Sequence, residues 1–197
     1  MLIYLLRHAA VQARHPRQFL GQTDLPLSEE GLRQAQGLAA QLAPIRFAGV
    51  YASSLRRAVH TAMLVGGRAW EDVHRVEAFR EIHLGDWEGL TVAEVEARFP
   101  GAYQARGANL ADFRPPGGES FRDLAERAWP ALLNIAQNGE IPGPLLIVAH
   151  AGVNRVLLAR IRGLGLEQIF TIPQQYGALS CLRYSAGRFD MVQTLPA

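Results

Sequence analysis

The chain has 197 residues, of which 49% are hydrophobic and 19% charged, and its formal net charge is +2. This length and composition are typical of a globular protein with a substantial core, and no long linker or low-complexity tail interrupts them. All 20 basic residues are arginines, which excludes a Schiff-base lysine and the lysine of a phosphate-binding P-loop.

The cysteine content, the charges and the apolar runs predict the compartment and the partners of the protein. Cys181 is the single cysteine, which excludes an intrachain disulfide and favours a reducing compartment. The first residues lack the features of a signal peptide, and no stretch approaches the length of a membrane-spanning helix. The arginines form no basic stripe with stacking aromatics. We therefore expect a cytoplasmic protein without a membrane or nucleic-acid partner; an oligomer is possible, but no sequence feature argues for one.

Taken in chain order, the hydrophobic pattern alternates between strands and helices. Apolar runs predict strands over residues 2–6, 47–52, 74–78 and 145–149, and a closing hairpin of 178–184 and 188–192 turned at 185–187. Helical spacing predicts helices from Ser28 to Pro44, after the Ser53–Ser54 pair, over 91–99, over 119–137 and over 151–162. This alternation favours an α/β fold, a three-layer α/β/α sandwich around a mostly parallel sheet, in a single domain over residues 1–197.

Helix caps and interruptions refine this prediction. Ser28 and the Ser53–Ser54 pair are expected to cap the first two helices. Pro130 lies inside the helix over 119–137 and is expected to kink or split it. Residues 100–118 are rich in proline and glycine, and we expect an irregular loop that forms a lid or a wall of the substrate site.

Polar side chains follow the ends of several predicted strands. Arg7 and His8 directly follow the first strand, and His150 follows the fourth. Arg57 lies in the first turn of the helix after the second strand, and Glu81 comes shortly after the third. Because the carboxyl ends of parallel strands meet at one edge of a sheet, we expect these five residues to lie together.

An arginine beside a histidine at such an edge suits an anion, and phosphate best. The guanidinium offers a fork of donors, and the imidazole is a potential nucleophile. Arg57 supports this interpretation, because a cation at a helix N-terminus opposes the helix dipole unless an anion binds there too. The alternative is a strand that merely ends at the surface in polar residues.

Six segments of the chain carry a resemblance to a known family: Leu6–Ala9, Gly21–Ser28, Ser53–Ala58, Glu81–Gly89, Pro116–Ser120 and Val148–Gly152. In this order they resemble the histidine phosphatase superfamily, which contains the cofactor-dependent phosphoglycerate mutases and many phosphatases. The resemblance covers nearly the whole chain and implies a phosphoglycerate mutase-like fold.

The resemblance also implies a role for each residue at the expected edge of the sheet. His8 would be the nucleophile that becomes a transient phosphohistidine, while Arg7, Arg57 and His150 would hold the phosphoryl oxygens. Glu81 would protonate the leaving oxygen and then activate water. Neighbouring positive charge would keep the His8 imidazole neutral and able to attack.

Several further expectations accompany these roles. The candidate substrate-binding groups besides the arginines and His150 are Gln22, Thr23 and Ala151. Nearby carboxylates that are alternatives to Glu81 as the acid are Glu77, Asp86 and Glu88. No histidine and carboxylate spacing fits a metal site, and phosphoryl transfer of this kind needs positive charge and in-line geometry, so we expect neither a metal nor a cofactor.

The chain departs from the commoner family pattern just after the nucleophile. Ala9 stands where glycine is usual, which is a mild exchange. Val11 and Arg14 stand where Thr or Ser and Asn are usual, and that Asn normally helps to bind phosphate. Arg14 would either take over with its own donors or indicate a larger or more acidic substrate.

The branch of the family is suggested by segment lengths. The short Glu81–Gly89 segment favours hydrolysis over a mutase, which must keep water from the phosphohistidine. Together with Phe19–Leu27 it resembles the α-ribazole phosphatases, which serve cobalamin assembly, and also broad-range phosphatases. We expect a small phosphorylated substrate. The alternatives are a cofactor-dependent phosphoglycerate mutase and a catalytically silent phosphate-binding module, although a pure binder would need neither His8 nor Glu81.

Overall fold

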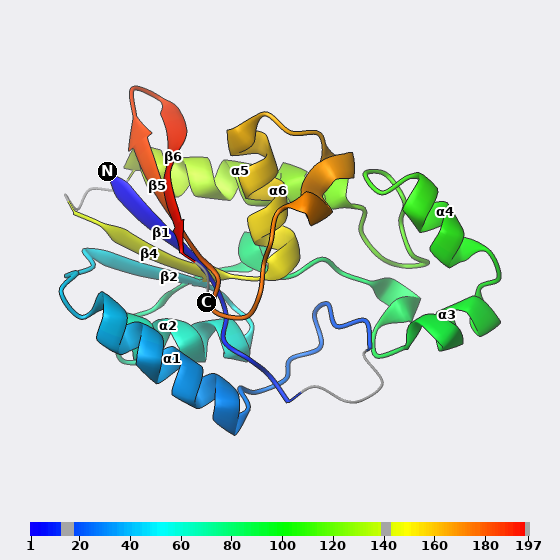
Figure 1. Ribbon diagram of the computed structural model, residues 1–197, viewed down its shortest axis with the longest axis horizontal. Coiled ribbons are helices and arrows are strands. Elements are labelled where there is room, and N and C mark those ends of the chain that lie inside the picture. Colours follow the sequence, from blue (N-terminus) through cyan, green and yellow to red (C-terminus); the bar gives the residue numbers. More distant parts are fainter. Residues whose placement is uncertain (13–17, 139–142, 196–197) are drawn as a thin grey trace.

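The structure, a computed structural model, describes residues 1–12, 18–138 and 143–195. Arg14 lies outside these ranges, so the expectation that concerns it stays a prediction. Within them, six strands form one sheet in the order β3-β2-β4-β1-β5-β6 (Figure 1). The strands are β1 (Leu2–Arg7), β2 (Gly49–Ser53), β3 (His74–Val76), β4 (Leu145–Ala149), β5 (Leu179–Ser185) and β6 (Arg188–Leu195). Strands β1 to β4 are parallel, and β5 is antiparallel to both of its neighbours.

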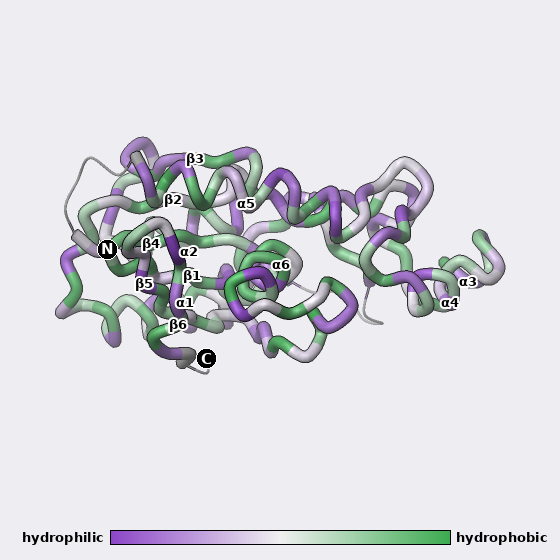
Figure 2. Tube along the Cα trace, turned by 90° about the horizontal axis from the view of Figure 1, so that it is seen from above, coloured by the Kyte–Doolittle hydropathy of each residue, from purple (hydrophilic) through white to green (hydrophobic). Residues whose placement is uncertain are grey.

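Helices cover both faces of this sheet. One face carries α1 (Glu29–Leu42) and α2 (Arg56–Gly66), and the other carries α5 (Phe121–Asn138) and α6 (Ala151–Arg162) (Figure 1). The short helices α3 (Val92–Arg98) and α4 (Ala102–Ala108) lie together at one end of the molecule in both views (Figures 1 and 2). Three 3-10 turns, η1 (Glu77–Phe79), η2 (Gly85–Trp87) and η3 (Leu166–Thr171), complete the helical elements. The predicted α/β/α sandwich with a mostly parallel sheet is confirmed.

The central strand β4 is apolar throughout, and β1 is apolar up to Arg7, because both strands face a core on each side. In β1, Ile3 and Leu5 pack with residues of α5 and α6, whereas Leu6 packs with residues of α1 and α2. In β4, Ile147 and Val148 divide between the same two cores. Successive side chains of a strand point to opposite faces, so a strand between two helical layers needs apolar residues at every position. In the described part of the chain, no helix is long and apolar enough to cross a membrane.

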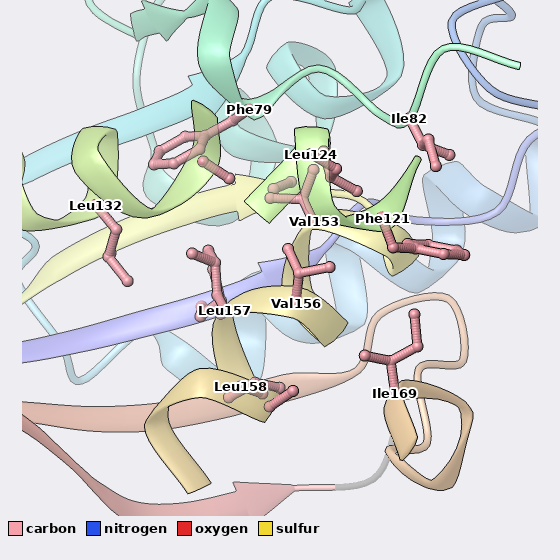
Figure 3. Packing of buried hydrophobic residues seen from close by; sticks show 14 of the residues in the cluster. Phe79, Ile82, Phe121, Leu124, Leu132, Val153, Val156, Leu157, Leu158 and Ile169 are labelled. Carbon is pink, nitrogen blue, oxygen red and sulfur yellow. The ribbon is translucent and has the colours of Figure 1, made fainter. Parts of the chain in front are cut away.

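The packing of α5 against α6 fixes one wall of the molecule (Figure 3). Leu124 and Leu132 of α5 are fully buried in the same cluster as Val153 and Leu157 of α6. Burial of each such side chain contributes about 1.5–3 kcal/mol. The N-terminus of α6, which directly follows β4, is therefore held firmly between the sheet and α5.

The second helix begins later than the sequence predicts, and the Ser53–Ser54 pair does not cap it. Helix α2 starts at Arg56, and Leu55 occupies the N-cap position without a side-chain hydrogen bond. Ser53 instead ends β2, is fully buried, and places its hydroxyl against His150. Ser28 does cap α1, through a hydrogen bond from the backbone N–H of Gly31.

The expected irregular loop over 100–118 and the expected split of the helix at Pro130 are wrong, whereas a kink at Pro130 stays a prediction. Residues 100–118 are not irregular throughout, because α4 forms within them once Gly101, in the left-handed conformation, has turned the chain after α3. Helix α5 runs unbroken through Pro130. A proline there removes one backbone hydrogen bond, but the buried apolar face of the helix outweighs that loss. The predicted third strand is shorter, since η1 replaces its last residues.

Candidate active site

The register of β1 and β4 brings two histidines side by side. Arg7 of β1 pairs with Ala149 of β4, so the next residues on the two parallel strands are His8 and His150. The His8 backbone N–H donates to the Ala149 carbonyl (3.0 Å), and the two ring centroids are 5.0 Å apart. Both side chains are buried, with 4% of His8 and none of His150 exposed. The ends of adjacent strands thus form one site, as the carboxyl edge of a parallel sheet predicts.

The tautomer of His8 is fixed by its backbone neighbour. His8 Nδ1 lies 2.7 Å from the Ala9 carbonyl oxygen, which can only accept a hydrogen bond. Nδ1 therefore carries the proton, and Nε2 keeps its lone pair. Ala9 is itself held by Thr61, whose hydroxyl accepts its N–H. Burial, Arg57 and Arg7 lower the pKa of His8 well below its usual range, so the ring is neutral and able to act as a nucleophile.

Arg57 brings a positive charge into the site and is almost completely buried. From the first turn of α2, its terminal nitrogens donate to the carbonyls of Thr23 (2.7 Å) and Gly21 (2.6 Å). Its Nε is buried without a hydrogen-bond partner among the described residues. A buried guanidinium with a spare donor beside His8 is suited to bind an anionic oxygen.

Arg7 and His150 contribute further donors. Arg7 donates to the Gln174 carbonyl and stacks on the ring of Tyr176, with 3.9 Å between its Cζ and the ring centroid. His150 Nε2 lies 2.7 Å from the Ser53 hydroxyl, while its Nδ1 is buried without a partner among the described residues. Burial and then Arg57 lower the pKa of His150 well below its usual range. A neutral His150 can share one proton with Ser53 or present it to a bound oxygen.

Glu81 lies against the N-terminus of α6, next to His150. Its carboxylate accepts the backbone N–H groups of Gly152 and Ile82, both at 3.0 Å. Glycine at position 152 leaves room for this contact, because an added Cβ would lie 2.4 Å from Glu81 Oε1 and the carboxylate would have to move. Glu81 is 8% exposed. This places a carboxylate at the same helix start that follows the His150 strand end.

The alternative carboxylates are placed elsewhere. Glu88 holds the loop at residues 21–23, accepting the backbone N–H groups of all three residues and the Thr23 hydroxyl. Glu77 is exposed and pairs with Arg80. Asp86 is exposed. None of these contacts joins them to His8 or His150.

The remaining candidates are occupied by other protein groups. The Gln22 side chain donates to the Glu81 carbonyl at 3.0 Å, and the Thr23 hydroxyl donates to Glu88 at 2.7 Å. Ala151 begins α6 and is half-buried. Val11 is buried and bridges to Leu27, so it packs in the core. Substrate binding by Gln22, Thr23 and Ala151 stays a prediction.

A model of the histidine phosphatase superfamily (branch 1) matches residues 3–194. This chain belongs to the histidine phosphatase superfamily. A similar member is the glucosyl-3-phosphoglycerate phosphatase of Mycolicibacterium vanbaalenii, which is 35% identical over 171 residues, covering 84% of this chain and 76% of that protein.

Solved structures of histidine phosphatases match over nearly their full length. The alpha-ribazole phosphatase from Shigella flexneri gives a TM-score of 0.90 at 27% identity, covering 100% of this chain and 96% of that one. A mycobacterial glucosyl-3-phosphoglycerate phosphatase complexed with VO3 gives 0.83 at 31% identity, covering 97% and 96%.

The candidate site of this histidine phosphatase includes residues that the sequence analysis missed. The Tyr176 ring lies 5.4 Å from that of His8, between centroids, and supports Arg7. No sequence signal singles out Tyr176, because it follows an irregular segment far along the chain. The sequence did carry a signal for Ser53, because this residue ends a parallel strand as Arg7 does. The signal was missed because a serine before a helix is also a typical N-cap.

Proposed function

We propose that this histidine phosphatase hydrolyses a phosphomonoester of a small metabolite through a phosphohistidine at His8. The fixed tautomer of His8 is the observation that carries the proposal. A neutral ring with its proton on Nδ1 and a lone pair on Nε2, flanked by Arg7 and Arg57, has the electronic state that attack on a phosphorus atom requires.

The first step transfers the phosphoryl group to the enzyme. The Nε2 lone pair forms a bond to phosphorus, and the ester P–O bond breaks. Arg7, Arg57 and His150 stabilise charge on the equatorial oxygens, which is the main task of a phosphoryl-transfer site. Protonated Glu81 gives its proton to the leaving oxygen, so the product departs as a neutral alcohol.

The second step returns the enzyme to its starting state. The Glu81 carboxylate takes a proton from water, whose oxygen attacks the phosphorus as the N–P bond breaks. The electron pair returns to His8 Nε2, and inorganic phosphate leaves. No redox partner is consumed. Metal independence is part of the proposal, and the relatives' complex with VO3 supports a phosphate-like occupant for the pocket.

Two substrate classes follow from the relatives. The motifs in Phe19–Leu27 favour α-ribazole 5′-phosphate as the substrate, in line with the likeness to the alpha-ribazole phosphatase from Shigella flexneri. The relative from Mycolicibacterium vanbaalenii favours glucosyl-3-phosphoglycerate. A comparison of kcat/KM for these two esters decides between them. A cytoplasmic setting, expected from the single cysteine, stays a prediction.

The test of the mechanism compares wild type with His8→Ala on p-nitrophenyl phosphate, with and without EDTA. We expect EDTA-insensitive turnover that falls by about 10³-fold or more in the variant. Turnover that survives in His8→Ala contradicts the proposal. If wild type is inactive, addition of 2,3-bisphosphoglycerate and an assay for mutase exchange separates a mutase from a phosphate-binding module.

A further inference from the structure

Arg127 of α5 binds the segment of backbone that carries Glu81. Its NH1 donates to the carbonyls of Ala78 (2.7 Å) and Arg80 (2.8 Å), and its NH2 donates to the carbonyl of Glu81 (3.0 Å). Its Nε and NH2 also form a bidentate pair with Glu119, at 2.8 and 2.9 Å. These contacts use all five N–H donors of a guanidinium.

Glu119 extends this hold to the other side of Glu81. Its carboxylate accepts the backbone N–H of His83 at 2.9 Å, and its own N–H donates to the His83 carbonyl at 2.8 Å. Residues 80–84 belong to no helix or strand, so their backbone N–H and C=O groups lack the hydrogen-bond partners that regular secondary structure supplies. Arg127 and Glu119 supply the missing partners on both sides of Glu81.

The Glu81 side chain depends on this backbone for its position. Its carboxylate is held by the N–H of the next residue, Ile82, and by Gly152 across the site. A shift of the segment would move the carboxylate off the Gly152 N–H. Helix α5 packs against α6, which carries Gly152. Arg127 therefore holds the backbone of Glu81 in a fixed position relative to the Gly152 N–H.

We infer that Arg127, together with Glu119, positions Glu81 for its proton transfers, without touching the substrate. The inference rests on the proposed function of Glu81. It also distinguishes Arg127 from the nearby Arg114 and Arg122, whose guanidinium groups form bidentate pairs with Asp123 and Asp112.

The sharpest readout is the dependence of rate on the leaving group. An acid catalyst matters most for a strongly basic leaving group and least for a weakly basic one. An alkyl ester such as O-phosphoserine needs the proton of Glu81, whereas p-nitrophenyl phosphate expels a stable phenolate. The change in the ratio of the two kcat/KM values, relative to wild type, reports the dependence on the leaving group, and it is independent of the fraction of protein that is folded.

The experiment measures this ratio for Arg127→Met, Arg127→Lys and Glu119→Gln, with Glu81→Gln as the reference. We expect Arg127→Met to lose about 10- to 100-fold on O-phosphoserine and less than about 3-fold on p-nitrophenyl phosphate. Arg127→Lys, which keeps the charge but not the fork, should be intermediate. The matched control is Arg122→Met, on the same helix and in a similar ion pair, which should keep the wild-type ratio.

Each outcome has one meaning. Equal losses on the two esters in the Arg127 variants, with the normal ratio change in Glu81→Gln, overturn the inference alone. An unchanged ratio in Glu81→Gln overturns the proposed role of Glu81 and the inference with it. If the Arg127 variants do not fold, Glu119→Gln decides: a fall in the ratio supports the inference, and a wild-type ratio overturns it.

Discussion

The protonation state of His8 is set by its burial and its immediate neighbours. The carbonyl of Ala9 fixes the proton on Nδ1, and the guanidinium groups of Arg57 and Arg7 oppose a second proton. Ala9 is held in turn by Thr61 of α2. For the proposed attack, the Nε2 lone pair is therefore in place before any ligand binds, which lowers the reorganisation that the reaction needs.

The contact between Gly152 and Glu81 leads to a prediction for a single methyl group. In Gly152→Ala, the added Cβ would lie 2.4 Å from Glu81 Oε1, so the carboxylate must move. We expect kcat/KM for an alkyl phosphate to fall by about 10-fold or more. The helix itself should tolerate alanine, which is favoured over glycine by about 1 kcal/mol in helices.

Steady-state kinetics with a parallel thermal melt check this result. Gly37→Ala is the matched control, because a Cβ at this position in α1 meets nothing within 4 Å. Wild-type activity in Gly152→Ala would show that Glu81 does not need its present position.

At the scale of single residues, the sequence located the groups that depend only on order along the chain. Arg7, His8 and His150 follow apolar runs, and that rule needs no knowledge of packing. This rule does not identify Tyr176 or Arg127, because their importance comes from contacts between segments that are far apart in sequence. Such contacts are decided by topology, which local patterns do not encode.

The loop at residues 21–23 is the element that links the Glu88 carboxylate to Arg57. Glu88 accepts four hydrogen bonds from it, and the carbonyls of Gly21 and Thr23 then accept those of Arg57. The Glu88 carboxylate thus binds the N–H groups of this irregular loop, and the carbonyls of the same loop bind the Arg57 guanidinium. The position of Arg57 is only as firm as this loop.

Loss of the Glu88 carboxylate should therefore weaken phosphate binding. We expect Glu88→Ala to raise KM, and the inhibition constant of inorganic phosphate, by roughly 10-fold, the equivalent of about 1.4 kcal/mol, with a smaller change in kcat. Glu96→Ala, at an exposed position on α3, is the control. An unchanged phosphate inhibition constant in Glu88→Ala would mean that the loop keeps Arg57 in place without it.

Elements with strong hydrophobic periodicity could be predicted from the sequence. Elements at which local signals for two different structures compete could not. The strand at 145–149 and the helix at 151–162 match the structure because apolar runs and helical spacing are unambiguous there. Helix α4 was missed because its flanking prolines and glycines masked a short run of helix formers. Serine is a good capping residue, but Ser53 is buried and its hydroxyl contacts His150 instead of the start of α2.

The whole molecule should lose stability in mild acid because it buries two neutral histidines. The pKa values of His8 and His150 are both lowered in the native state, mainly by burial. Below the unfolded value of about 6.5, the unfolded chain binds protons that the native state does not, so the free energy of unfolding falls as the pH falls. The slope should approach about 1.4 kcal/mol per pH unit for each histidine.

Urea unfolding at a series of pH values between 7.5 and 5 measures this slope. The double variant His8→Asn/His150→Asn should show a much flatter dependence, whereas His74→Asn, at an exposed position, should keep the wild-type slope. Carboxylates such as Asp123, whose pKa is lowered by its hydrogen bonds with Arg114, act only at lower pH. An equally steep slope in the double variant would rule out the two histidines as its source.

The pairing of β1 with β4 has a consequence for the order of events during synthesis. The two strands are far apart in the sequence, so β4 is synthesised long after β1. His8 therefore has no second histidine beside it until residues 145–150 have been made and β4 has paired with β1. A nascent chain that ends before β4 lacks the proposed catalytic site.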